Sequence, residues 1–378
     1  MQIIHIVENL DSRYGGPAKS VPLLVKYLDI LGIKNKIFTI KWWEDESNPI
    51  LDEYDYDIQK FDLKGIKKIN YGVGFKETLK KEITKDTIIH IHGLWTYPMY
   101  CAYKIAKKYN IPYIVATRGM LCVWCLEQNK FIKNLAFNLF IKDMLENASY
   151  LHLTAEQEND ELDSIGIKNK NRVIIPNGIE IDNKFDNIDE KLLKIINYDK
   201  NKFYIMFLGR ISKKKGLHYL INSYKNIKEK YKKVEILVVG GIEDKEYFNS
   251  LENIDGVKFL GQLDGIAKHT IFSISDLFVL PTYNENFGIV IAEAMTYKLP
   301  VITTTGTPWK EIKEKNAGWW VELSQENLDK ALEEALNCSD ECLAKKGNNG
   351  YNIIQNYTWD KQALKMKEIY NKILKGEK

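Results

Sequence analysis

Short apolar runs rich in β-branched residues alternate with longer segments of helical periodicity in the first half of the chain. The apolar runs predict strands at residues 3–8, 36–40, 87–92, 113–117, 150–154 and 172–176. Apolar positions that recur every three or four residues predict helices at residues 19–31, 97–109 and 126–147. Because the strands are apolar almost throughout, we expect a parallel sheet with helices on both faces.

This pattern lapses once and then restarts. The segment from about residue 178 to residue 202 is polar and rich in Asn and Asp, which predicts a linker. Further strands are predicted at residues 203–209, 234–241, 257–261, 276–281 and 300–304, and a last helix at residues 360–374. The predicted organisation is an N-terminal α/β domain, a linker, a C-terminal α/β domain and a terminal helix, at residues 1–180, 181–202, 203–357 and 358–378.

The composition fits two globular domains. At 378 residues the chain exceeds what one hydrophobic core usually serves, and 45% of its residues are apolar. The net charge of +3 argues against nucleic acid as a partner. The first residues, MQIIHIVENL, lack the basic region and long apolar core of a secretory signal, so we expect a cytoplasmic protein.

The five cysteines are scattered, which indicates reduced thiols. Cys122 and Cys125 form a C-x-x-C, but the other close pair, Cys338 and Cys342, lies over two hundred residues away. A zinc or redox site would need a second pair nearby, so no metal site is expected.

Two loops that follow predicted strands carry candidate phosphate-binding residues. Gly15 and Gly16 precede a helix, where glycines let backbone N–H groups approach a phosphate; an ordinary tight turn is the alternative. Arg210 and Lys215 in GRISKKKG flank a strand-to-helix turn, and both cations suit phosphate oxygens; a solvated basic loop is the alternative.

A third loop opens the segment NENFGIVIAEAM. We expect a helix from near Phe287, so the amides of Phe287, Gly288 and Ile289 would be free donors at its positive end. Glu285 precedes that end and Glu293 lies about two turns inside, so the two carboxylates can span up to about 12 Å. That interval suits the hydroxyl groups at the two ends of a nucleotide sugar. In the alternative, a plain amphipathic helix, an unpaired Glu293 among apolar neighbours would be costly.

Together these segments and IPNGI resemble the retaining glycosyltransferases of family 4, which have the GT-B fold. The resemblance extends over nearly the whole chain, and the two glutamates of ENFGIVIAE are its most specific part. It implies two Rossmann-like parallel-sheet domains that face a cleft, with the C-terminal helix packed back on the N-terminal, acceptor-binding domain. It also implies transfer without a metal or other cofactor, because cationic side chains stabilise the leaving group.

The resemblance implies a role for each matching residue. Arg210 and Lys215 would hold the donor diphosphate, while Glu293 would bind the ribose and Glu285 the transferred sugar. The base pocket would be lined by the loops after Gly241 and Gly261. The complete donor site implied in this way comprises Gly15, Gly16, Arg210, Lys215, Gly261, Asn286, Phe287, Gly288, Ile289 and Glu293.

Two N-terminal motifs, HGLW and TRGML, indicate which subgroup of this family the chain resembles. With TPW and GWW they resemble bacterial surface-polysaccharide transferases of the O-antigen or capsule type. Many family members carry a histidine where this chain has Arg118, so a histidine contact to the sugar 6-hydroxyl is not carried over to that place. His92, in the first of these motifs, could contact the donor or the acceptor; a purely structural packing role is the alternative. The catalytic candidates are Glu285, Lys215, Arg210, His92 and Arg118.

The implied reaction moves a sugar, with retention, from GDP-mannose or a UDP-sugar to a hydroxyl of a glycan. A lipid-linked oligosaccharide of cell-surface polysaccharide synthesis is the expected acceptor. The segment 126–147 interleaves lysines with Phe, Leu and Ile, so it could touch the cytoplasmic face of the inner membrane; a core helix is the alternative.

Other interpretations remain at this point. A protein of the same fold could bind a nucleotide sugar without transfer, or epimerise it without an acceptor. A phosphorylase would need a longer chain and a pyridoxal-bearing lysine. Asp55-Tyr56-Asp57 fits the D-x-D of metal-dependent GT-A transferases, but two matched α/β blocks disfavour that class.

Overall fold

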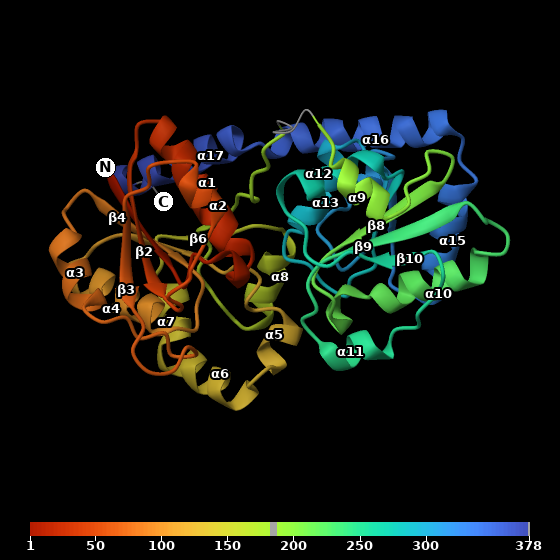
Figure 1. The fold of residues 1–378 in the computed structure, drawn as a ribbon. Helices are drawn as coiled ribbons and strands as arrows, with labels where there is room; N and C mark the ends of the chain where they lie inside the picture. Colours follow the sequence, from red (N-terminus) through yellow and green to blue (C-terminus); the bar gives the residue numbers. More distant parts are fainter. Residues whose placement is uncertain (182–186, 377–378) are drawn as a thin grey trace. The chain divides into compact units, whose positions relative to one another are not determined.

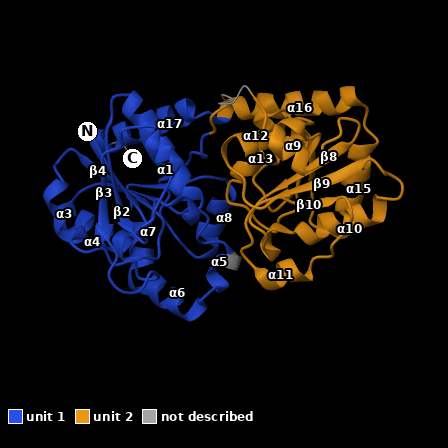
Figure 2. Ribbon diagram, in the orientation of Figure 1, with its two compact units in different colours: residues 1–178, 357–378 blue, residues 179–356 orange. Residues whose placement is uncertain are grey.

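The computed structural model describes residues 1–181 and 187–376, except for the side chains of Val123 and Trp124. These residues form two compact units, shown in different colours in Figure 2. The first unit contains residues 1–178 and the chain from Tyr357 onward, and the second contains Ile179–Asn356. The predicted linker at 181–202 belongs to the second unit, and its residues 182–186 lie outside the described part of the chain.

The described part of the first unit contains a sheet of seven parallel strands in the order β3-β2-β1-β4-β5-β6-β7 (Figure 1). The strands are β1 (Gln2–Val7), β2 (Lys34–Lys41), β3 (Ile58–Asp62), β4 (Thr87–His92), β5 (Tyr113–Ala116), β6 (Tyr150–Leu153) and β7 (Arg172–Ile174). The strand order reverses between β1 and β4, which places a topological switch point at their carboxyl ends.

Helices cover both faces of this sheet. They are α1 (Gly16–Ile30), α2 (Pro49–Asp52), α3 (Phe75–Glu82), α4 (Tyr97–Tyr109), α5 (Val123–Glu127), α6 (Lys130–Ala136), α7 (Lys142–Glu146) and α8 (Gln157–Ser164). Successive side chains of a strand point to opposite faces, so Ile4 of β1 packs with α3 and α4 while Ile3 packs with α1. The apolar strands of the sequence are therefore explained by burial on both sides.

The last helix, α17 (Trp359–Lys375), returns to the first unit. Its residues Trp359, Met366 and Tyr370 share a buried cluster with Ile3 of β1. The Lys367 ammonium donates a hydrogen bond of 2.9 Å to the carbonyl at the end of α1, and the Trp359 ring fills the space that a side chain at residue 178 would need. The predicted packing of the terminal helix on the N-terminal domain is confirmed.

The described part of the second unit contains a sheet of six parallel strands in the order β10-β9-β8-β11-β12-β13, with its switch point between β8 and β11. The strands are β8 (Phe203–Leu208), β9 (Val234–Val239), β10 (Val257–Phe259), β11 (Leu277–Leu280), β12 (Val301–Thr304) and β13 (Gly318–Val321). The helices are α9 (Glu190–Ile195), α10 (Leu217–Ile227), α11 (Lys245–Ser250), α12 (Gly265–Ile274), α13 (Ile289–Thr296), α14 (Glu311–Glu314), α15 (Gln325–Leu336) and α16 (Asp340–Ile354). Two parallel α/β sheets, as predicted, thus make up the fold.

Local structure differs from the sequence predictions in several places. The edge strands β3 and β13 were not predicted, because IQKFD is mostly polar and GWWV is only half-buried. The helix predicted at 126–147 is interrupted by Asn129, whose φ is 54°, and by a π-helical turn at Phe137–Ile141. The predicted linker contains α9, because Asp189 caps its first amides. No helix among residues 1–181 and 187–376 is long and apolar enough to cross a bilayer.

Candidate functional site

The loops after β8 and β11 are joined directly at the switch point of the second unit. The backbone amide of Tyr283 and the hydroxyl of Thr282 both donate to the carbonyl of Lys214, at 2.9 and 3.0 Å. Gly216 allows this approach, because a Cβ there would lie 1.9 Å from the carbonyl oxygen of Pro281 and the φ of Gly216 is 68°. Ligands of such sheets bind where these loops meet.

Two of the predicted site residues form an ion pair inside this junction. Lys215, in the 3₁₀ turn Lys213–Lys215, donates from its ammonium to the Glu285 carboxylate, and the Thr282 hydroxyl oxygen lies 3.3 Å from the same carboxylate oxygen. Each side chain of the pair is 13% exposed. The ammonium has three N–H donors, so this contact leaves it able to bind a further anion.

The other two charged candidates are paired with residues that the sequence analysis missed. The exposed Arg210 pairs with Glu243, which follows β9. Glu293 pairs with Lys268 of α12, with 2.7 Å between Nζ and Oε1. Neither partner could be found from local spacing, since each lies at least 25 residues away in the sequence.

Glu293 also keeps one unused acceptor. Its Oε2 is buried and accepts no hydrogen bond from any described residue. An unsatisfied buried carboxylate oxygen costs free energy, commonly about 1–3 kcal/mol. The atom is therefore suited to accept a hydrogen bond from a ligand, and Lys268 holds the carboxylate in place through its other oxygen.

The helix α13 begins at Ile289, two residues later than predicted, so Glu293 lies in its second turn rather than about two turns inside it. Gly288 precedes the helix with a φ of 75°. The indole of Trp309, 1% exposed, donates to the carbonyl of Phe287 at 2.5 Å and so supports the start of α13 from behind. The TPW motif therefore has a structural role beside the site, and the first amides of α13 lack carbonyl partners within the helix.

The remaining predicted donor residues fall at the carboxyl ends of strands in their own units. Gly15, with a φ of 106°, and Gly16 form the start of α1, and a Cβ on either would meet no atom within 4 Å. Gly261, with a φ of 70°, follows β10, and Asn286 lies between Glu285 and Phe287 in the loop after β11. The predicted donor residues of the second unit thus lie on the loops that follow β8, β10 and β11, except Ile289 and Glu293, which belong to α13.

A chain of hydrogen bonds lies at the switch point of the first unit. Arg118 can only donate, so its Nη2 donates to Nδ1 of His92 at 2.9 Å, which leaves the hydrogen of His92 on Nε2. Nε2 of His92 then donates to Nδ1 of His5 at 3.0 Å, and Nε2 of His5 donates to Asn35 at 3.1 Å. Asn35 donates in turn to Asp29 at 2.7 Å. Every step runs in one direction, which requires both histidines to be neutral.

A second chain runs beside the first. The hydroxyl of Tyr370 donates to Nδ1 of His90 at 2.8 Å, Nε2 of His90 donates to Nδ1 of His152 at 3.2 Å, and His152 donates to the Ile175 carbonyl at 2.8 Å. Burial is the largest cause that lowers the pKa of all four histidines, to about 4 for His5 and about 3 for His152. The nearby Arg118 cation lowers these pKa values further.

Three of these rings also have the spacing of a metal site. His5, His90 and His92 bring ring nitrogens within 4.8 Å of one another. Each of the six nitrogens already has a hydrogen-bond partner, and the Arg118 cation adjoins the group. A metal ion would have to break these bonds and bear that repulsion, so this cluster favours hydrogen bonding over metal binding.

Arg118 itself is held in an unusual conformation. It follows β5 in a turn closed by a 3.0 Å hydrogen bond from the Met120 amide to the Thr117 carbonyl, and its φ is 53°. The buried carboxylate of Glu158 fixes both flanks, accepting from the Thr117 hydroxyl at 2.7 Å and from the Gly119 amide at 2.6 Å. The side chain then reaches His92 and, at 2.8 Å, Asn177.

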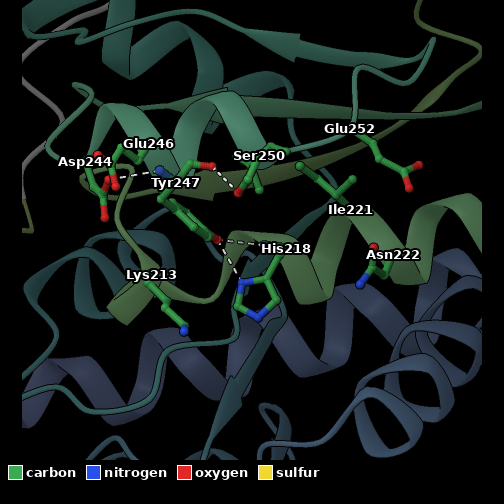
Figure 3. A pocket seen from close by; sticks show the side chains of 10 residues that line it. Lys213, His218, Ile221, Asn222, Asp244, Glu246, Tyr247, Ser250 and Glu252 are labelled. Carbon is green, nitrogen blue, oxygen red and sulfur yellow. Dashed lines mark hydrogen bonds between the residues drawn. The ribbon is translucent and has the colours of Figure 1, made fainter.

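A hollow of about 520 Å³ lies elsewhere in the second unit, between α10 and α11 (Figure 3). It is lined by the acids Asp244, Glu246 and Glu252 and by Lys213 and His218. Three carboxylates repel a diphosphate. We therefore place the candidate donor site at the loops after β8 and β11 rather than in this hollow.

The chain is similar to known proteins over both units. Residues 188–371 match the model described as "Glycosyl transferases group 1", and residues 80–178 match "Glycosyl transferase 4-like domain". The capsular polysaccharide biosynthesis glycosyltransferase CapM of Staphylococcus aureus is 34% identical over 214 residues, which are 53% of this chain and 54% of CapM. The matched part thus spans about half the length of that relative.

Solved structures share the fold over the full length. Sucrose-phosphate synthase from Thermosynechococcus elongatus has a TM-score of 0.76 at 19% identity, with 100% of both chains covered. HepE of Anabaena, solved in complex with UDP-glucose, has a TM-score of 0.76 at 16% identity, with 98% of this chain and 99% of that chain covered. At identities of 16–19%, this similarity shows a shared fold and nothing about activity.

Proposed function

Because the chain carries a glycosyl transferases group 1 domain and a glycosyl transferase 4-like domain on a GT-B fold, we propose that it is a retaining glycosyltransferase. It would move a sugar from a UDP- or GDP-linked donor to a hydroxyl of a glycan in cell-surface polysaccharide synthesis, as the name of the CapM relative suggests. Transfer would require no metal or other cofactor.

The observation that carries this proposal is the group of charges at the β8/β11 switch point. Lys215 and Glu285 meet there, and Glu293 presents a buried, unpaired carboxylate oxygen one turn into α13. A nucleotide sugar needs a cation for its diphosphate and acceptors for the hydroxyls at either end. This group supplies both kinds of partner.

In the proposed mechanism, the acceptor hydroxyl attacks on the same face of the sugar from which the nucleotide leaves. Its proton passes to the departing phosphate oxygen. The charge that develops on this oxygen is stabilised by Lys215, Arg210 and the first amides of α13. Glu285 orients the transferred sugar and at the same time fixes the Lys215 ammonium, while Glu293 holds the ribose.

The acceptor would be bound by the first unit and, if it is lipid-linked, would be reached at a membrane surface. Four apolar side chains of α6 and the following π-helical turn are exposed: Phe131 at 83%, Ile132 at 67%, Leu135 at 54% and Leu139 at 70%. Lys130 of α6 is also exposed. An apolar face beside a cation suits the interface of an anionic bilayer.

The test is a donor screen followed by transfer. We expect UDP or GDP to raise the melting temperature, since a ligand stabilises the state that it binds. With the matching nucleotide sugar and a glycan acceptor, release of nucleoside diphosphate should persist in EDTA and the product should keep the donor's anomeric configuration. Lys215→Ala should abolish transfer in a protein that stays folded. Full activity of that variant, turnover of donor without acceptor, or an inverted product would contradict the proposal.

A further inference from the structure

We propose that Arg118 binds an anionic group, a carboxylate or a phosphate, of a substrate held by the first unit. This inference rests on the proposed function and deepens it, because it gives the chemical class of one substrate group. Arg118 lies at the carboxyl end of β5, beside the β1/β4 switch point where such sheets bind ligands.

Arg118 carries a charge that the described part of the protein does not balance nearby. The guanidinium donates to Asn177 and to a neutral His92, and no carboxylate among the described residues lies within ion-pairing distance of it. The buried carboxylate of Glu158 is already used by the turn, since it accepts from Thr117, Gly119 and the Thr154 amide. Burial lowers the pKa of Arg118 only to about 10, so it remains a cation at neutral pH. A desolvated cation without a counter-ion favours an anionic ligand.

Arg118 is also held in place at a cost in free energy. Arg118 adopts a φ of 53°, a left-handed conformation that costs a residue other than glycine about 1 kcal/mol or more. Its Nε is buried and has no acceptor among the residues that the structure describes. Such costs accumulate at sites where the surrounding structure imposes a functional geometry. Glu158 imposes this one by fixing both flanks of the turn.

The hydrogen bonds around Arg118 leave it with N–H groups to donate. Each terminal nitrogen of Arg118 gives one N–H to a neutral acceptor and keeps one N–H for another partner. The chain from His92 through His5 to Asn35 fixes the His92 tautomer that can accept from Arg118. His92 is therefore a positioning residue, whose two ring nitrogens are both used by the protein. The planar fork of the guanidinium suits a carboxylate or a phosphate.

The experiment measures binding of small anions to the full chain. Sodium glucuronate and glucose form a matched pair that differs by a carboxylate, inorganic phosphate represents a phosphate group, and UDP probes the nucleotide site. Affinities are measured by calorimetry for the wild type and for Arg118→Gln, Arg118→Lys and Lys215→Ala. Circular dichroism verifies that each variant is folded, and Arg118→Lys keeps the charge if the glutamine variant is unstable.

We expect the wild type to bind glucuronate or phosphate more tightly than glucose. Arg118→Gln should weaken binding of that anion by about tenfold or more, with Arg118→Lys in between, and the loss should exceed the one caused by Lys215→Ala. A preference for glucuronate would mean that Arg118 binds the carboxylate of a sugar. A preference for phosphate would mean that it binds a phosphate group of the substrate. If Arg118→Gln weakens UDP as much as phosphate, the anion is the diphosphate of the donor.

Equal binding of both anions by the wild type and Arg118→Gln would overturn the inference. So would a wild type that binds UDP but neither anion. Failure of the proposed function has a different signature, because the wild type would then bind neither UDP nor GDP.

Discussion

Acidification should destabilise the first unit through its four buried histidines. In the folded state both hydrogen-bond chains require neutral rings, and the pKa values are lowered to about 4 for His5, about 3 for His152 and well below 6.5 for His90 and His92. In the unfolded chain each ring titrates near 6.5. Below pH 6.5 the unfolded state therefore binds more protons, and the free energy of unfolding falls as the pH is lowered toward the folded pKa values.

The magnitude follows from this difference. Between pH 7.5 and pH 5.0, protonation stabilises the unfolded form by about 2 kcal/mol for each of His5 and His152, and His90 and His92 act in the same direction. Native proteins are stable by only about 5–15 kcal/mol, so the loss of stability by pH 5 should be readily measurable.

The assay is urea unfolding at several pH values, followed by hydrogen exchange of the peptide that contains β4 (Thr87–His92). Carboxylates titrate as well, so the matched comparison is His5→Gln, whose amide offers one donor and one acceptor in place of the ring. The variant should lose about 2 kcal/mol less than the wild type between pH 7.5 and pH 5.0. Identical pH dependence of the two proteins, or ring signals that titrate near 6.5 in the folded state, would refute the reasoning.

Three further predictions concern the second unit and the exposed helix. Glu293→Ala should mainly weaken nucleotide binding, by about tenfold, whereas Glu285→Ala should mainly lower kcat; equal losses of donor affinity alone would contradict this division. Gly216→Ala should destabilise the second unit by about 2 kcal/mol or more in thermal unfolding, because its Cβ would meet the Pro281 carbonyl; an unchanged melting temperature would contradict the close approach. Phe131→Ser should reduce sedimentation with anionic vesicles without changing the melting temperature, and undiminished co-sedimentation would exclude this face of α6 as the contact.

The regular part of the fold could be predicted from the sequence because burial on both faces leaves apolar strands with an unmistakable pattern. Two of the four edge strands could not, since β3 is mostly polar and β13 is only half-buried, whereas the edge strands β7 and β10 were predicted. The break of the helix at 126–147 depends on Asn129 in the left-handed region and on a π-helical turn. Neither changes the spacing of apolar residues enough to reveal the break in the sequence.

The same limit applies to the sites. The charged residues of GRISKKKG and ENFGIVIAE could be chosen as candidates because both segments directly follow predicted strands. Their partners Glu243 and Lys268 come from other elements, so only the three-dimensional structure assigns them. The histidine chains join residues up to 280 positions apart, although the HIH of β4, which sends two histidines to one face, was a local signal.

The return of α17 to the first unit has a consequence for biosynthesis. Domains usually fold in turn as the polypeptide leaves the ribosome. Here the first sheet cannot complete its core early, because Trp359, Met366 and Tyr370 are made only after the whole second unit. Until then the apolar surface that α17 covers, which includes Ile3 and Ile88, is exposed, and His90 lacks its hydrogen bond from the Tyr370 hydroxyl. The order of synthesis therefore favours completion of the second unit before the first, and a nascent chain released early would expose an apolar surface to chaperones.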